Sequence, residues 1–226
     1  MRAFLRLTLA MLFLIQGSWT AQAGEDLTGV YVISRGINAT DGSTYTGKVA
    51  IQHHKDNMYA IVWDEGVSSN NEGIGLAVDN LLCTGWSNND DYGVTVYKVQ
   101  GGRLYGTSIS HGTNETPGTE VLEGPPELHG TYEIVSAHGS DDGVEYSGTV
   151  GIQKTGEVYQ LRWWIGNYTY TGVGLLKGDL FIVGWSAGLL EGVNYYEIKG
   201  HELLGRWATS GTSATTAGVE NLVRRN

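Results

Sequence analysis

The sequence predicts an all-β protein made of two tandem repeats, each an antiparallel meander of about eight short strands that closes into a small β-barrel. Three observations predict this class. The chain matches itself at a shift of about 100 residues, apolar residues alternate with a period of two, and turn signals recur roughly every 8 to 12 residues. A β-sandwich in each repeat is the alternative that these observations leave open.

The internal repeat extends over nearly all of the chain beyond residue 24. Asp41–Gln52 matches Asp142–Gln153 at a shift of 101 residues, and Gly73–Leu76 matches Gly172–Leu175 at a shift of 99. Such small changes of shift indicate turns of different length within one common fold.

The repeat sets the predicted domain bounds. We expect a first barrel repeat at 24–122, a Pro-rich linker at 123–126 and a second barrel repeat at 127–226. The three prolines of the chain lie at 117–126, as expected where strands fill the rest of the sequence.

Period-two alternation identifies a predicted core face. In Tyr59–Trp63 and its counterpart Tyr159–Trp163, every second residue is apolar in both repeats, whereas the residues between them change. The kept face therefore predicts core positions at Tyr59, Trp63, Tyr159 and Trp163. An eight-stranded barrel with such a core is either filled by side chains or holds one small ligand.

The first residues have the pattern of a secretory signal peptide. Two arginines precede an apolar stretch at 7–15, and small residues lead to Ala21-Gln-Ala23. We therefore expect a signal peptide at 1–23 and an exported protein, either periplasmic or extracellular. No second apolar stretch has the roughly 20 residues that a membrane span needs, so no span is expected.

Charge and cysteine content exclude several classes of protein. The chain has 14 Lys and Arg against 24 Asp and Glu, a formal net charge of −10. Nucleic-acid binding is not expected, because it requires clustered basic residues that neutralise phosphates. The single cysteine, Cys83, excludes a disulfide framework and a cysteine-based zinc site.

No catalytic or metal-binding constellation recurs in both repeats. Gly184–Gly188 matches the G-x-S-x-G motif, but that motif needs a strand-to-helix turn, and the first repeat breaks it at 85–89. His53 and His54 are adjacent in a predicted strand, so they point to opposite faces. We expect no catalytic residue, no metal ligand, no cofactor and no enzymatic activity.

Several motifs resemble a known family. They are Gly130-Thr-Tyr132, Tyr146-Ser-Gly148, Gly172-Val-Gly-Leu175, Leu204-Gly-Arg-Trp207 and Gly218-Val-Glu220. The series is similar to a bacterial secreted family of repeats of about 100 residues that is often labelled fibronectin-binding protein. The resemblance implies a binding role. The first repeat departs from it at Ser108, where the second repeat has Trp207. By fold analogy alone, the meander is also similar to avidin and lipocalin barrels.

Aromatic residues near strand ends are the predicted binding residues, because such rings can stack on sugars or cover apolar ligands at a barrel mouth. They are Trp86, Trp185, Tyr168, Tyr170 and Tyr195. The variable loops at 66–72, 88–91 and 189–191 are the predicted macromolecule-binding surface.

Two functions follow from the sequence. The first is a secreted or periplasmic non-catalytic binding protein, adhesin-like, whose partner is fibronectin or another extracellular protein or glycan. The alternative is a calycin-like carrier of a small apolar ligand. A carrier requires inward-facing small residues that leave a cavity, whereas an adhesin can have filled barrels.

Overall fold

The computed structural model describes residues 26–64, 66, 71–188, 191–210 and 215–225. In these residues the chain forms strands and no helix, which confirms the all-β prediction. The predicted signal peptide lies outside the described residues. Within them, no helix is long and apolar enough to cross a membrane.

The strands of the first repeat are β1 (Gly29–Ile37), β2 (Thr44–Tyr45), β3 (Lys48–Lys55), β4 (Met58–Asp64), β5 (Asn71–Val78), β6 (Leu81–Ser87), β7 (Tyr92–Gln100), β8 (Arg103–Ser110) and β9 (Gly118–Glu123). Those of the second repeat are β10 (Gly130–His138), β11 (Thr149–Thr155), β12 (Val158–Ile165), β13 (Tyr168–Lys177), β14 (Leu180–Ser186), β15 (Glu191–Lys199), β16 (Glu202–Thr209) and β17 (Gly218–Arg224).

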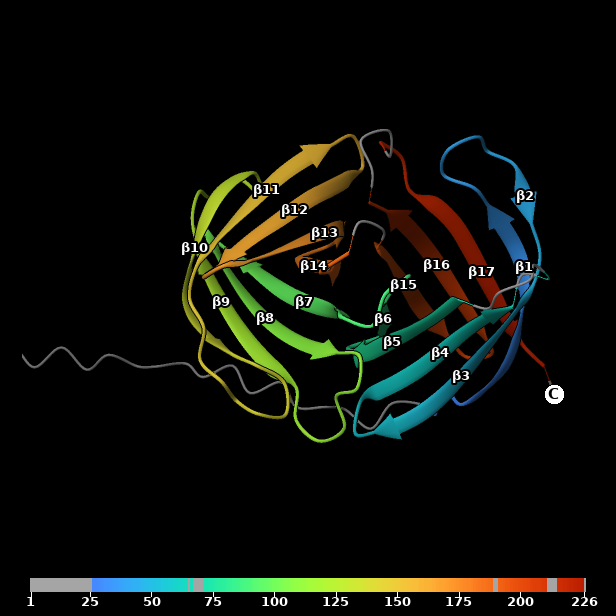
Figure 1. Cartoon of the computed structure of the whole chain (residues 1–226). Helices are drawn as coiled ribbons and strands as arrows, with labels where there is room; N and C mark the ends of the chain where they lie inside the picture. Colours follow the sequence, from blue (N-terminus) through green and yellow to red (C-terminus); the bar gives the residue numbers. More distant parts are fainter. Residues whose placement is uncertain (1–25, 65, 67–70, 189–190, 211–214, 226) are drawn as a thin grey trace, which may run out of the picture.

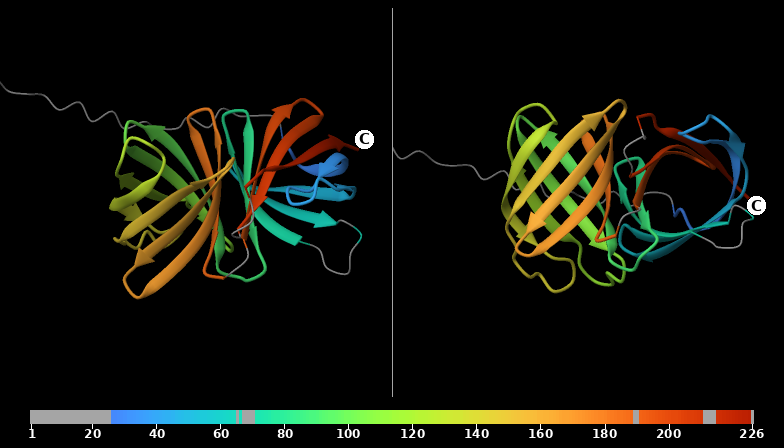
Figure 2. Two further views of the ribbon diagram at one scale, coloured as in Figure 1. Left: turned by 90° about the horizontal axis from the view of Figure 1, so that it is seen from above. Right: turned by 45° about the horizontal axis from the view of Figure 1, so that its top comes forward.

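These strands form two closed eight-stranded antiparallel barrels that lie next to each other (Figure 1). We call the barrel of β7 to β14 the inserted barrel, because it is continuous in sequence from Tyr92 to Ser186. We call the other the split barrel; it contains β1 and β3 to β6, followed around the ring by β15 to β17. Figure 2 shows the split barrel in blue, teal and red, and the inserted barrel in green, yellow and orange.

Each barrel therefore contains strands of both repeats. β6 pairs with β15, and β14 pairs with β7. A barrel closed within one repeat would instead pair β6 with β7. The Pro-rich linker joins β9 to β10, which are neighbours inside the inserted barrel. The predicted barrel bounds at 24–122 and 127–226 thus do not coincide with the two barrels, although the two-barrel prediction itself is confirmed.

The repeat itself supplies the physical reason. β7 and β15 occupy equivalent positions and present the same alternation, so either strand offers β6 an equivalent edge. Four residues connect β6 to β7, and four connect β14 to β15, so the chain passes between the barrels twice at one place. Exchange of identical elements between similar units costs little free energy, because the contacts within each unit are kept.

Three apolar clusters hold the structure together. One fills the split barrel and includes Tyr59 and Trp63, and a second fills the inserted barrel and includes Tyr159 and Trp163. The third lies between the barrels and is made of outward-facing residues of both, among them Cys83. Each large apolar side chain buried in this way contributes about 1.5–3 kcal/mol to stability.

Glycines permit the close approach of the barrels where the chain passes between them. A Cβ atom on Gly85 would lie 2.4 Å from the carbonyl oxygen of Gly93. A Cβ atom on Gly184 would lie 2.1 Å from the carbonyl oxygen of Gly192. Both contacts are to backbone atoms, which cannot move aside as a flexible side chain can.

We predict that Gly184→Ala lowers the free energy of unfolding by about 1–3 kcal/mol, because a side chain forced into a packed interface shifts the backbone. Denaturant unfolding measures the loss. Gly151→Ala is the matched control, since its Cβ would lie 3.2 Å from the ring of Trp164, whose side chain is 45% exposed and can move. Equal stability of the two variants would contradict the close backbone packing.

The topology also predicts which fragments fold. Residues 90–188 contain all eight strands of the inserted barrel, so this fragment should be a monomer with a cooperative thermal transition. Residues 127–226 contain strands of both barrels and should form an exchanged dimer. Light scattering and circular dichroism measure both properties. An unfolded 90–188 fragment together with a monomeric 127–226 fragment would show that the barrels close within the repeats.

Candidate ligand-binding site

A cavity of about 250 Å³ lies at one mouth of the inserted barrel. Its lining comes from six strands and from the loop between β10 and β11. The lining residues are Thr95, Ser108, Ser110, Glu120, Gly139, Ser140, Tyr146, Trp163, Ile165, Tyr170 and Trp185.

A buried carboxyl group lies in the wall of this cavity. Glu120 is only 3% exposed. Its Oε1 accepts hydrogen bonds from the Tyr97 hydroxyl and, at 3.3 Å, from the Trp163 Nε1. Its Oε2 accepts one from the Tyr146 hydroxyl at 3.1 Å. Because a buried carboxylate is stable only when hydrogen-bonded, these three donors explain how the chain tolerates the charge there.

The electrostatics of the cluster follow from its burial. Burial raises the pKa of Glu120, and the hydrogen bonds from Tyr97, Trp163 and Tyr146 oppose that rise. Burial likewise raises the pKa of Tyr97 and Tyr146, and the negative charge of Glu120 adds to the effect. Both tyrosines therefore stay protonated and remain hydrogen-bond donors to the carboxylate.

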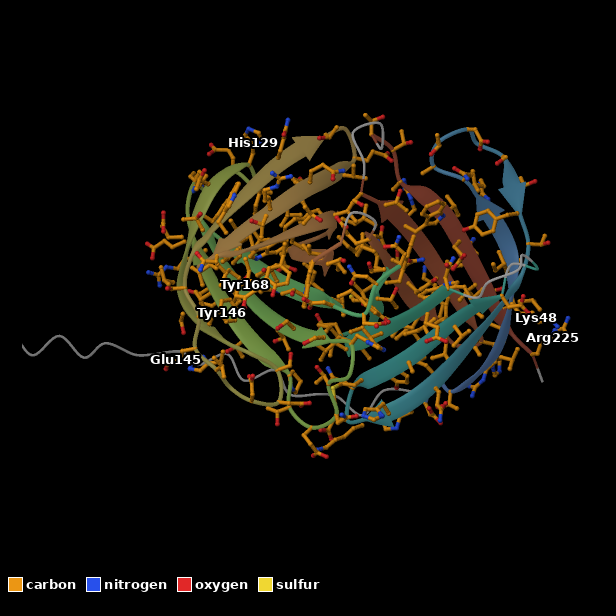
Figure 3. All side chains as sticks on the ribbon, in the orientation of Figure 1. Lys48, His129, Glu145, Tyr146, Tyr168 and Arg225 are labelled. Carbon is orange, nitrogen blue, oxygen red and sulfur yellow. The ribbon has the colours of Figure 1, made fainter. Side chains whose placement is uncertain are left out.

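The remaining lining divides into a hydroxyl side and an aromatic side. Thr95, Ser108, Ser110 and Ser140 supply hydroxyl groups, and the Ser110 and Ser140 Oγ atoms lie 3.1 Å apart. On the aromatic side, Tyr170 meets Trp185 edge to face, with ring centroids 5.7 Å apart and an interplanar angle of 88°. None of the lining residues that the structure describes is a Lys, Arg or His. Figure 3 shows Tyr146 on the inserted barrel, with Lys48 and Arg225 on the far side of the split barrel.

The split barrel repeats the same carboxyl cluster. Glu220 Oε1 accepts hydrogen bonds from the Trp63 Nε1 at 3.0 Å and from the Tyr196 hydroxyl at 2.5 Å. Its Oε2 accepts one from the Tyr45 hydroxyl at 3.0 Å. Each of these residues is the repeat counterpart of a member of the Glu120 cluster.

Several substitutions distinguish the two mouths, and those at Ser108 and Thr95 replace a small side chain by a larger one in the split barrel. Where the inserted barrel has Ser108, the split barrel has Trp207, whose indole packs edge to face on Tyr45 with centroids 6.3 Å apart. Where the inserted barrel has Thr95, the split barrel has Asn194, which accepts a hydrogen bond from the Trp86 Nε1 at 3.2 Å. In the split barrel, larger side chains thus occupy the two positions that Ser108 and Thr95 hold at the cavity of the inserted barrel.

The structure separates the five predicted binding aromatics. Tyr170 and Trp185 line the cavity, and Tyr168 is 71% exposed on the inserted barrel (Figure 3). Trp86 lies in the split barrel against Asn194. Tyr195 packs between the barrels, with the Lys177 Nζ 5.9 Å from its ring centroid.

The predicted core aromatics are buried, and one of them also has a place in the cavity. Tyr59, Trp63 and Tyr159 belong to the barrel interiors. Trp163 belongs to the interior of the inserted barrel and lines the cavity as well. Its ring packs in the core, while its Nε1 reaches Glu120.

The other motifs of the sequence lie outside the cavity. Ser186 is buried at the end of β14, and its Oγ accepts hydrogen bonds from the Ser87 hydroxyl and the Gly188 amide. The described residues contain no helix, so Ser186 does not lie on the strand-to-helix turn that the motif needs. His53 and His54 are exposed on β3. Burial raises the pKa of the Cys83 thiol, which lies in the cluster between the barrels. Among the described residues, no group of three His, Cys, Asp or Glu side chains could hold a metal ion.

Of the loops predicted to bind a macromolecule, only 88–91 is described throughout. In the other two, residues 67–70 and 189–190 lie outside the described part of the chain.

Sequence reasoning missed Glu120 and Glu220 as site residues. The signal was present, because Gly118, Glu120 and Leu122 share one face of a period-two strand, which places a carboxyl group among inward-facing residues. The second repeat has the same arrangement at Glu220. An acidic residue kept on an inward face in both repeats indicates a buried polar cluster.

The fold and the cavity together define a paired β-barrel protein with a polar and aromatic cavity in one barrel. Comparison with models of known protein families, with curated proteins and with solved structures found no match to this chain.

A second buried carboxyl group lies beside the cavity, where the chain passes between the barrels. Glu191, at the start of β15, is fully buried and accepts a hydrogen bond from the Thr171 hydroxyl of the inserted barrel at 3.3 Å. Its backbone amide donates to the Ser210 Oγ of the split barrel at 3.2 Å. Burial raises the pKa of Glu191 to about 7, against hydrogen bonds from Thr171 and Ser210 that lower it.

Glu191 makes stability depend on pH. Its folded-state pKa of about 7 exceeds the ordinary value of 4.5, so the folded protein holds this proton more tightly than the unfolded chain does. The stabilisation that protonated Glu191 gives the folded state is complete below about pH 4.5. It is lost as the pH rises to about 7, which lowers the free energy of unfolding by about 3 kcal/mol.

We therefore predict that Glu191→Gln flattens the fall in stability between pH 5 and pH 8, because the amide does not ionise. Urea unfolding at a series of pH values measures the change. Glu133→Gln, at an exposed position on β10, is the control and should leave the profile as it is. A Glu191→Gln profile parallel to that of the unaltered protein would show that this carboxyl group titrates normally.

Proposed function

We propose that the protein binds a small molecule in the mouth of the inserted barrel and does not transform it. The observation that supports this most directly is that the inserted barrel has Ser108 at the position where the split barrel has Trp207. The common Glu, Tyr and Trp cluster stabilises both barrels, whereas the open space occurs where the large side chain is replaced by a hydroxyl group.

The size and lining of the cavity support a ligand of about one ring. Its volume of about 250 Å³ is just below the roughly 300–1,000 Å³ of pockets that hold drug-sized ligands. Four rings and four small hydroxyl side chains face it, a combination that lets a ligand stack on one side and hydrogen-bond on the other.

Binding without turnover is the role that this lining supports. Glu120, the acidic residue of the cavity, already accepts hydrogen bonds from three neighbours. No histidine, lysine or cysteine lines the cavity to activate a serine hydroxyl. The proposal thus follows the alternative function given by the sequence, a carrier of a small ligand, and assigns the ligand to the inserted barrel.

The adhesin-like function stays a prediction. It rests on the resemblance to the fibronectin-binding family and on the predicted export of the chain. A filled split barrel is compatible with such a role for the outer surface, so binding of an extracellular protein or glycan and binding of a small ligand are separate properties of the molecule.

We predict that Ser108→Trp abolishes small-molecule binding, because it introduces into the inserted barrel the side chain that fills the split one. A library of single-ring compounds bearing amine, hydroxyl or carboxyl groups is screened by thermal shift, and hits are titrated by tryptophan fluorescence, which Trp163 and Trp185 report. Affinity should fall by at least about 100-fold, since the site itself is removed.

Two further variants make the test specific. Trp207→Ser in the split barrel is the matched control, because it changes the same position in the other mouth and should leave the affinity of the inserted barrel unchanged. Ser110→Ala removes one hydroxyl group without filling the space and should reduce affinity by about tenfold or less. Hits that bind the Ser108→Trp variant as well as the unaltered protein would refute the proposed site.

A further inference from the structure

We infer that the ligand of this cavity is an organic cation whose ammonium group binds beside Glu120 and whose apolar body contacts the aromatic side. This inference rests on the proposed function and specifies its ligand class. The structure supports it in three steps: the free capacity of the carboxylate, the composition of the lining, and the position of the rings.

The hydrogen bonds of Glu120 leave one acceptor position open. A carboxylate offers about four acceptor positions, two on each oxygen. Tyr97 and Trp163 occupy both positions of Oε1, whereas Tyr146 is the single donor to Oε2 among the described residues. Since Glu120 lines the cavity, the remaining position on Oε2 is available to a donor on a ligand.

The charge balance of the lining favours a cationic donor. Among the described lining residues, Glu120 is the one carboxyl group, and none of them is a basic side chain that would compensate its charge. Its three hydrogen-bond donors are neutral phenol and indole groups. A buried carboxylate without a counter-ion gains free energy when a cation arrives, because the charge pair replaces lost hydration.

The wider charge distribution acts in the same direction. The inserted barrel, residues 92–186, has five Lys and Arg against ten Asp and Glu. Burial raises the pKa of the cavity residue Tyr170, and the carboxylate of Asp91, just before β7, adds to that rise. A negative potential around the mouth concentrates cations and excludes anions.

The rings complete a site for the rest of the cation. Tyr146, Trp163, Tyr170 and Trp185 line the cavity with Glu120. The faces of aromatic rings attract cations, most strongly where the contact is shielded from water. Ser108, Ser110 and Ser140 add hydroxyl acceptors for the remaining N–H groups of an ammonium.

The split barrel combines the same carboxyl cluster with a different mouth. Glu220 has the same three neighbours, but Trp207 packs on Tyr45 in that mouth. The structural contribution of the cluster and the proposed ligand contact can therefore be measured separately, with Glu220 as the internal reference for Glu120.

The experiment compares three probes of similar shape and different charge: benzylammonium, benzyl alcohol and benzoate. Isothermal titration of the chain from residue 24 onward at pH 7.5 should give an affinity for benzylammonium at least about tenfold above that for benzyl alcohol, because a hydrogen bond between charged groups is stronger than one that involves a neutral donor. Benzoate should not bind.

Glu120→Gln should remove the preference for the cation over the alcohol, because the amide keeps the shape and loses the charge. Glu220→Gln changes the equivalent cluster in the filled barrel and should leave the preference intact. Lowering the pH provides a test without substitution. Protonation of Glu120 should weaken the binding of benzylammonium and leave that of benzyl alcohol unchanged.

The outcomes distinguish this inference from the proposed function. If benzyl alcohol binds as tightly as benzylammonium, and Ser108→Trp abolishes both, the cavity is a binding site and the cation inference is wrong. If benzylammonium binds equally well to the Ser108→Trp variant, it binds elsewhere and both proposals fail for this probe. Absence of benzylammonium binding at millimolar concentration overturns the cation inference.

Discussion

The hydrogen-bonded carboxylate inside each barrel is the interaction on which the rest of the structure depends. A carboxylate removed from water is strongly unfavourable unless donors surround it, so its partners must be held in place. In the inserted barrel, Glu120 and Tyr97 come from the first repeat, while Tyr146 and Trp163 come from the second. The cluster of the inserted barrel is therefore assembled from strands of both repeats. The split barrel assembles its Glu220 cluster across the repeats in the same way.

This constraint explains why two similar barrels can differ in their mouths. The carboxylate cluster and the apolar interior fix the ring of strands, so residues nearer the opening are free to change. Trp207 adds half-buried aromatic surface to the split barrel through its contact with Tyr45, and such aromatic contacts stabilise a fold. The inserted barrel, with Ser108, forgoes that contribution. Binding sites typically lack a stabilising contact that an equivalent position elsewhere in the molecule keeps.

Much of the fold could be predicted from the sequence, because the repeat and the period-two alternation depend on local residue order. Those signals identified the strands, the two-barrel class and buried positions such as Trp63 and Trp163. The exchange of strands could not be predicted in the same way. β7 and β15 have the same pattern, so the residue order of β6 does not determine which of them becomes its neighbour.

The site was partly visible in the sequence. Tyr170 and Trp185 were among the predicted binding residues, and the change at Ser108 was noted as a departure from the repeat. The cavity itself could not be predicted, because it depends on side chains from six strands that only the closed ring brings together. Glu120 was missed for a different reason. In isolation an acidic residue in a strand indicates a solvent-exposed face, and only the shared face with Leu122 indicates otherwise.

The insertion of one barrel into the other also determines how rigid the cavity is. The cavity residue Trp185 lies one position before Ser186, which accepts a hydrogen bond from Ser87 of the split barrel. Tyr170 lies next to Thr171, whose hydroxyl donates to the buried Glu191. The aromatic side of the cavity is thus attached to the place where both chain segments pass between the barrels and where glycines allow backbone contact. A cavity wall held on two sides loses little conformational entropy when a ligand binds, so even a ligand of one ring can be recognised with few contacts.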